Sequence, residues 1–251
     1  MKLVREHINE ISLGGSHLER MGTGIKASIK RWFDIAGISA KDYTINDDLT
    51  INVWPVGRYL DLRGTQITSL PDNLSVGGSL DLSGTPITSL PDNLSVEGSL
   101  WLRGTPITSL PDNLSVRGSL YLRGTPITSL PDNLSVGGSL YLTGTPITSL
   151  PDNIKFRYIN GDLDLSGTNI TSLPNNLWVV GELNLNHTSI TSLPSDLKVD
   201  GDLWLRGTQI TSLPNIRIGR NLYLNDALVT SFDLNKINVG FNVIDPDGYK
   251  I

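Results

Sequence analysis

The stretch from residue 98 to residue 117 reads GSLWLRGTPITSLPDNLSVR, and nearly the same letters recur without a break from residue 78 to residue 137. Looser copies extend this repeat in both directions. The first leucine of each Leu-x-Leu pair marks nine units: Leu60, Leu80, Leu100, Leu120, Leu140, Leu163, Leu183, Leu203 and Leu222. A unit this short cannot bury its own apolar side chains, so neighbouring units must stack and the two ends need caps. The sequence therefore predicts an elongated solenoid.

The pattern within one unit predicts the path of the chain. Leu80 and Leu82 alternate with polar residues, as in a short strand with one buried face. Pro91 excludes a helix interior, and the Pro-Asp-Asn sequence that it begins favours a tight turn. We expect one strand per unit, a curved parallel β-sheet on the concave face, and extended or turn-like returns on the convex face.

Two further positions of the unit have a structural interpretation. The residue before the threonine is glycine in seven units, and His187 and Asp226 in the other two. Histidine and aspartate are enriched among non-glycine residues at positive φ, so we expect this position often to adopt left-handed backbone. A lone histidine is then structural rather than catalytic. Threonine follows in eight units, and its hydroxyl is expected to donate to a neighbouring backbone carbonyl.

The order L-x-L-x-x-T-x-I-x-x-L-P-x-x-L resembles a leucine-rich repeat over about three quarters of the chain. Threonine stands where that family usually has asparagine, and glycine stands where its first leucine would fall. The short unit with its Leu-Pro step is similar to repeats of bacterial effectors that recognise host proteins, a resemblance that implies protein binding. The opening MKLVREHINE and the later YTINDDLTINV resemble uncharacterised proteins of tailed bacteriophages and environmental bacteria.

Composition narrows the function further. The chain has no cysteine, which excludes thiol catalysis, disulfides and thiolate zinc sites. The formal charge of −5 divides into +2 for residues 1–45 and −7 for the remainder, so the repeats lack the basic stripe of a nucleic-acid-binding surface. No stretch is apolar and long enough to span a bilayer, and the first residues lack the apolar core of a secretion signal.

The sequence also lacks the residue groups of an active site. We find no nucleophile beside a base, no cluster of metal ligands and no phosphate-binding loop, so we expect a protein that is not an enzyme and has no cofactor or metal. From the lack of cysteine and of a secretion signal, we expect the protein to lie in the cytoplasm of a bacterium or of a phage-infected host cell. We also expect the chain to be a monomer by itself.

The candidate binding site is the outward position between the paired leucines, where the repeats vary most. Trp101, Tyr121 and Tyr141 occupy it in three successive units, with Arg103 and Arg123 beside them. Later units add Trp204, Arg206 and Tyr223. Tryptophan, tyrosine and arginine are enriched at energetic hot spots of protein interfaces. The alternative is cross-strand stabilisation of the sheet without a partner.

Two weaker signals extend this candidate site. Asp162, Glu182 and Asp202 replace the serine that precedes the first leucine, and three like charges in register could attract basic residues of a partner. A solvated polar face explains them equally well, and calcium binding is a third, weaker alternative because no recognised loop spacing surrounds these oxygen ligands. A three-residue insertion before Leu163 adds a second candidate, a loop that holds Phe156, Arg157 and Tyr158. A packing patch at this irregularity of the repeat is an equal alternative for the loop.

The ends of the chain are expected to cap the stack. Residues 24–36 place Ile25, Ile29, Trp32 and Phe33 on one face of an amphipathic helix, next to a first strand at 49–53. A membrane-surface role is the alternative for this helix. A short helix at 3–11 could form a mobile arm, and Phe241, Val243 and Ile244 predict a last strand. The predicted divisions are an N-terminal arm and helical cap (1–47), the solenoid (48–232) and a C-terminal cap (233–251).

The sequence thus favours a non-enzymatic recognition protein that binds a protein or peptide on its concave face, and that acts as a phage or bacterial effector or inhibitor of a host factor. The alternative is a glycan-binding protein, in which aromatic faces stack on sugar rings.

Overall fold

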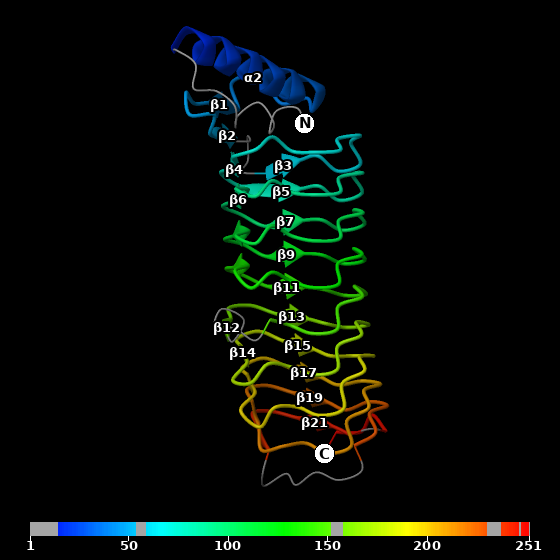
Figure 1. Ribbon diagram of the computed structural model, residues 1–251. Coiled ribbons are helices and arrows are strands. Elements are labelled where there is room, and N and C mark those ends of the chain that lie inside the picture. Colours follow the sequence, from blue (N-terminus) through cyan, green and yellow to red (C-terminus); the bar gives the residue numbers. More distant parts are fainter. Residues whose placement is uncertain (1–14, 54–58, 152–157, 230–236, 246, 251) are drawn as a thin grey trace.

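The computed structural model describes residues 15–53, 59–151, 158–229, 237–245 and 247–250, with side chains from residue 24 onward. Within this part, the chain forms a stack of parallel-stranded turns with a helix at its N-terminal end (Figure 1). This is the solenoid architecture expected from the leucine-rich-repeat resemblance. The predicted short helix at 3–11 lies outside the described residues.

Three ladders of short strands run along the stack. The main sheet has ten strands: β3 (Tyr59–Asp61), β5 (Ser79–Asp81), β7 (Leu100–Trp101), β9 (Leu120–Tyr121), β11 (Leu140–Tyr141), β13 (Leu163–Asp164), β15 (Leu183–Asn184), β17 (Leu203–Trp204), β19 (Leu222–Tyr223) and β21 (Val243–Ile244). Each strand pairs in parallel with its neighbours, leucine opposite leucine as far as β19, where Leu222 lies opposite Val243 of β21. Figure 1 shows these strands in a single column along the length of the molecule.

Two shorter ladders follow one another along one side of the main sheet (Figure 1). The first side sheet comprises β1 (Tyr43–Ile45), β2 (Ile51–Val53), β4 (Leu74–Val76), β6 (Ser95–Val96), β8 (Ser115–Val116) and β10 (Ser135–Val136). The second side sheet comprises β12 (Tyr158–Ile159), β14 (Trp178–Val179), β16 (Lys198–Val199), β18 (Arg217–Ile218) and β20 (Asn238–Val239). The two side sheets are separate ladders, ending at β10 and starting at β12, whereas the main sheet is continuous through the pairing of β11 with β13.

The prediction of one strand per unit was therefore wrong. Leu74, Ser75 and Val76 form a second strand whose two apolar residues are buried and whose serine is partly exposed. This Leu-Ser-Val segment has the same period-two pattern as the first strand, but it is so short that the sequence did not separate it from the return. The rest of the return was anticipated correctly: Leu114 N–H donates to Pro111 O at 3.2 Å, which closes the expected turn.

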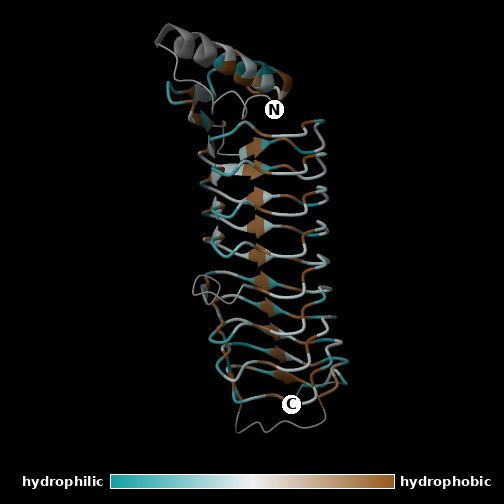
Figure 2. Cartoon of the chain, viewed as in Figure 1, coloured by the Kyte–Doolittle hydropathy of each residue, from teal (hydrophilic) through white to brown (hydrophobic). Residues whose placement is uncertain are grey.

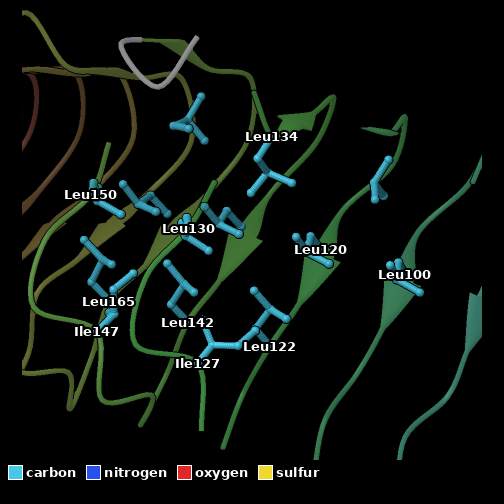
Figure 3. Packing of buried hydrophobic residues seen from close by; sticks show 14 of the residues in the cluster. Leu100, Leu120, Leu122, Ile127, Leu130, Leu134, Leu142, Ile147, Leu150 and Leu165 are labelled. Atoms are coloured by element: carbon cyan, nitrogen blue, oxygen red, sulfur yellow. The ribbon is translucent and has the colours of Figure 1, made fainter. Parts of the chain in front are cut away.

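The core is a set of leucine, isoleucine and valine columns. Leu80, Leu100 and Leu120 are fully buried, as are Ile87 and its equivalents in the central turns. Figure 2 shows the apolar residues of the main-sheet strands aligned along the stack, and Figure 3 shows leucine and isoleucine side chains of successive turns packed together. Each buried aliphatic side chain contributes about 1.5 to 3 kcal/mol before chain entropy is subtracted.

The threonine and glycine positions behave as expected. All seven glycines before the threonine have positive φ, and so do His187 (57°) and Asp226 (55°). The threonine that follows is buried, and its hydroxyl donates to the carbonyl three residues earlier, for example from Thr125 to Leu122 O at 2.8 Å. The acceptor lies within the same turn. These contacts satisfy the polar groups of each corner.

The N-terminal cap is a helix, α2, that spans Gly15–Ile35. It begins earlier than predicted, because glycines at 22 and 24 do not end it. Phe33 is fully buried and stacks on Tyr43 with a centroid distance of 3.9 Å, and Trp32 Nε1–H donates to Ser69 O at 3.0 Å. The first strand of the repeats, β2, begins at Ile51 and gains an antiparallel neighbour, β1, that was not predicted. The helix therefore caps the apolar core.

The C-terminal end differs in one detail from its prediction. Val243 and Ile244 form β21, the last strand of the main sheet, and Ile244 forms an antiparallel bridge with Lys250. Phe241 lies before this strand and is 70% exposed, so its assignment to the strand was wrong.

Candidate functional site

The main sheet presents one outward position per strand between its paired leucines. Parallel pairing places these residues in register, so Trp101 lies beside Tyr121 and Tyr121 beside Tyr141. Neighbouring strands lie about 4.8 Å apart, which brings the side chains of adjacent turns into contact. The predicted contiguity of the three aromatic residues is confirmed, and we call Trp101, Tyr121 and Tyr141 the aromatic stack.

The rings of the aromatic stack lie face to face. Trp101 and Tyr121 have a centroid distance of 5.1 Å and an interplanar angle of 7°, and Tyr121 and Tyr141 have 4.6 Å and 9°. All three residues remain partly exposed. The faces of Tyr121 are therefore turned toward its neighbours, and the stack offers mainly ring edges and polar ends to a partner.

Tyr59 extends the stack at its N-terminal end. Its ring meets Trp101 edge-on at 5.6 Å, and its hydroxyl donates to the buried Asp81 carboxylate at 2.7 Å. Tyr59 was not among the predicted site residues, because it occupies the position before the first leucine rather than the one after it. A tyrosine where later units have serine was the available signal.

Arg103 and Arg123 lie beside the stack, are exposed, and form no salt bridge with any described residue. The other arginines at this position are paired. Arg63 Nη2 lies 2.7 Å from Asp61 Oδ2, and Arg206 Nε lies 3.0 Å from Asp226 Oδ2. Among the arginines at this position of the repeat, Arg103 and Arg123 are thus the two without a carboxylate partner in the described chain.

Two hydrogen-bond donors within the stack, Tyr121 O–H and Trp101 Nε1–H, have no hydrogen bond to a described residue. The third donor, Tyr141 O–H, donates to Asp162 Oδ2 at 3.0 Å. Together with Arg103 and Arg123, these groups form a cluster of hydrogen-bond donors. Such a cluster fits carboxylate or backbone carbonyl acceptors.

The acidic residues Asp162, Glu182 and Asp202 have a different environment from the one expected. In the earlier turns, each serine of this column accepts from the backbone of the next turn, as Ser99 Oγ does from Ser119 N–H at 3.0 Å. Asp162 Oδ1 accepts from Glu182 N–H at 3.0 Å, and Asp202 Oδ1 from Asn221 N–H at 2.8 Å. Two of the three carboxylates therefore continue a structural ladder, and Glu182 is the exposed member.

Trp204 and Tyr223 form a second stacked pair, with a centroid distance of 3.6 Å and an interplanar angle of 3°. Asp164 and Asn184 occupy the strand positions between this pair and the aromatic stack. The predicted residues therefore form two separate groups. Of the predicted insertion residues, Phe156 and Arg157 lie outside the described residues, and Tyr158 lies on the second side sheet, away from the main-sheet column.

Local electrostatics raise the pKa of three tyrosines on this face. Burial, with the hydrogen bond to Asp81, raises the pKa of Tyr59 to about 12. Burial raises the pKa of Tyr141, and the hydrogen bond to Asp162 adds to the rise. Burial and then the charges of Asp202 and Glu182 raise the pKa of Tyr223. With raised pKa values, these three phenols are neutral at pH 7.

The described residues contain no group of three or more histidine or acidic side chains placed to hold a metal ion. In the same part of the chain, no helix is long and apolar enough to cross a membrane. Aromatic edges, phenol and indole donors and arginines are suited to non-covalent recognition.

No protein-family model matches the chain, and no curated protein matches it. Among solved structures, a similar chain is YopM from Yersinia enterocolitica WA-314, with 18% sequence identity and a TM-score of 0.21. The match covers 74% of this chain and 65% of that chain. The chain thus spans slightly less than two thirds of that protein, and the fold described above rests on the strand ladders rather than on this match.

Proposed function

We propose that this chain is a non-enzymatic recognition protein that binds a partner protein or peptide on the outward face of its main sheet. The observation that carries this proposal is the aromatic stack with Arg103 and Arg123 beside it. Aromatic and arginine side chains supply most of the binding energy in many protein interfaces. The unpaired Arg103 and Arg123 fit a partner segment rich in hydrogen-bond acceptors such as carboxylates.

The repeats themselves provide the comparison with a purely structural role. Asp164 and Asn184 occupy the same position as the stack residues, and their strands pair with the same leucine register. Aromatic residues are therefore not needed to form this sheet. The stack still contributes cross-strand stabilisation of about 0.2 to 1 kcal/mol per pair, so its removal is expected to lower stability modestly as well as to weaken binding.

The stacking geometry does not favour the glycan-binding alternative. Sugar rings pack on free aromatic faces, but the faces of Tyr121 are turned toward Trp101 and Tyr141 at interplanar angles of 7° and 9°. Only the two ends of the stack could offer an open face.

We extend the proposal to a role as a phage or bacterial effector that inhibits a host factor in the cytoplasm, with the chain acting as a monomer. The support for this extension is the resemblance of the repeats to bacterial effectors and of MKLVREHINE to tailed-phage proteins.

Affinity capture from a lysate of the source cell or its host tests the proposal. The bait is the wild-type chain, and the comparison is Trp101→Ala/Tyr121→Ala/Tyr141→Ala. The matched control is Phe241→Ala/Tyr249→Ala, which removes two exposed rings outside the predicted site. We expect at least one protein to be retained by the wild type and the matched control and lost with the triple variant. Identical recovery by all three baits would contradict the proposal.

A further inference from the structure

A second column of outward side chains lies on the second side sheet. Its strand pairing places Tyr158, Trp178, Lys198 and Arg217 in register, and we call these four residues the side stripe. Tyr158 is 49% exposed and Trp178 is 40% exposed. Among the described residues of the two side sheets, these are the exposed aromatic side chains. The side stripe shares no residue with the aromatic stack.

The first side sheet shows that the fold does not need these side chains. There the same outward position holds serine in four turns, and the strands pair in the same parallel register: Ser75, Ser95, Ser115 and Ser135. Serine at this position is therefore compatible with the same parallel ladder that holds tryptophan or lysine in the second side sheet. The aromatic and basic residues therefore require an explanation other than solenoid stacking.

The side stripe is ordered by its own contacts. The rings of Tyr158 and Trp178 meet edge to face with a centroid distance of 5.2 Å and an interplanar angle of 85°. Lys198 Nζ lies 5.6 Å from the centroid of the Trp178 ring, and the indole N–H donates to Asp200 Oδ2 at 2.8 Å. These contacts fix the orientation of Trp178 while leaving part of its ring exposed, which lowers the entropy lost when a partner binds.

The charge of the side stripe sets the chemistry of its partner. Lys198 and Arg217 form no salt bridge within the described chain, and their two positive charges outnumber the negative charge of Asp200, whose Oδ2 accepts from Trp178 Nε1–H. Two cations adjoining two exposed rings fit an anionic partner that also carries an apolar side chain. Two charges are too few for the phosphate contacts of a nucleic-acid-binding surface.

We propose that the side stripe docks an acidic segment of a partner protein. Carboxylates of that segment pair with Lys198 and Arg217, and an aromatic or aliphatic side chain packs on Tyr158 and Trp178. This second docking surface goes beyond the proposed function of the main sheet and does not depend on it.

Random dodecapeptides selected for binding to the full chain test this proposal. Peptides are selected on the wild type and depleted on Trp178→Ser/Lys198→Ser, a variant that carries the serine natural to the first side sheet. A second variant, Lys198→Glu/Arg217→Glu, retains both rings and reverses the charge. Trp101→Ala serves as the control for the main sheet, and the affinity of each selected peptide is measured by fluorescence anisotropy.

The expected peptides are rich in aspartate and glutamate and contain an aromatic or large aliphatic residue. Their affinity should fall about tenfold or more with either side-stripe variant, should weaken with salt, and should be unchanged by Trp101→Ala. Selection of basic or neutral sequences, failure to enrich any peptide, or equal affinity for the charge-reversed variant would overturn the proposal. None of these results depends on whether the main-sheet stack binds a partner.

Discussion

Alanine at Gly124 should destabilise the solenoid, although the space around this glycine is open. Gly124 has a φ of 68°, and a Cβ built there meets nothing within 4 Å. The cost is therefore in the backbone: left-handed conformation costs an L-residue about 1 to 2 kcal/mol. Alanine also lowers the conformational entropy of the unfolded chain, which offsets about 0.4 to 1 kcal/mol of this backbone cost. We expect a net loss of about 1 kcal/mol in the free energy of unfolding.

Two matched variants isolate the backbone effect. Gly24→Ala adds the same methyl group in open space, but within the α2 helix, where alanine is favoured over glycine by about 1 kcal/mol. It should therefore be neutral or stabilising. Gly124→Asn should be milder than Gly124→Ala, because asparagine tolerates the left-handed region as His187 and Asp226 do in their own turns.

Urea unfolding followed by circular dichroism measures all three variants, with the midpoints compared only if the m-values agree. The reasoning would be refuted if Gly124→Ala and Gly24→Ala shifted the midpoint in the same direction by similar amounts, or if asparagine at position 124 were worse than alanine.

Two further predictions concern single hydrogen bonds. Thr125→Val keeps the shape of a buried side chain but removes the hydroxyl that donates to Leu122 O at 2.8 Å. It should lower the free energy of unfolding by about 1 kcal/mol in the same urea assay. An unchanged midpoint would contradict the role given to the buried threonines. Tyr59 should titrate at about 12, above the ordinary value of about 10, because burial and Asp81 favour the neutral phenol. The neutral Tyr59 phenol contributes its full stabilisation below pH 10, and this contribution declines as pH rises toward 12. Tyr59→Phe should therefore flatten the dependence of stability on pH in this range. It should also remove the highest-pH step from the ultraviolet titration of tyrosinate. An unchanged titration would show that Tyr59 is not the perturbed group.

The repeat made the architecture predictable. The spacing of Leu80, Leu100 and Leu120 sets the stack, and the glycine, histidine and aspartate alternatives at one position were enough to anticipate positive φ there. The second strand, such as Ser95–Val96, was not predicted, because two residues carry too little periodicity to distinguish a strand from a return.

For the candidate site, the outward residues and their order along the sheet were predictable. Register follows from the repeat, so the adjacency of Trp101, Tyr121 and Tyr141 could be derived from the sequence. Their face-to-face orientation could not, since it depends on side-chain rotamers. The partners of Asp162 and Asp202 are backbone N–H groups of the next turn, which a pattern of charges does not reveal. Of the side stripe, Tyr158 was predicted as a residue of the insertion loop, whereas Trp178, Lys198 and Arg217 were missed for the same reason as the strands that carry them.

Photo-crosslinking from position 121 tests the central claim most directly. Tyr121 is replaced by p-benzoylphenylalanine, which retains an aromatic ring at the centre of the stack, and the control carries the same group at Thr128, an exposed position on the return. After irradiation in lysate of the source cell or its host, we expect a defined protein adduct from position 121 and none of that mass from position 128. The same adducts from both positions, or none from position 121, would contradict recognition through the main sheet.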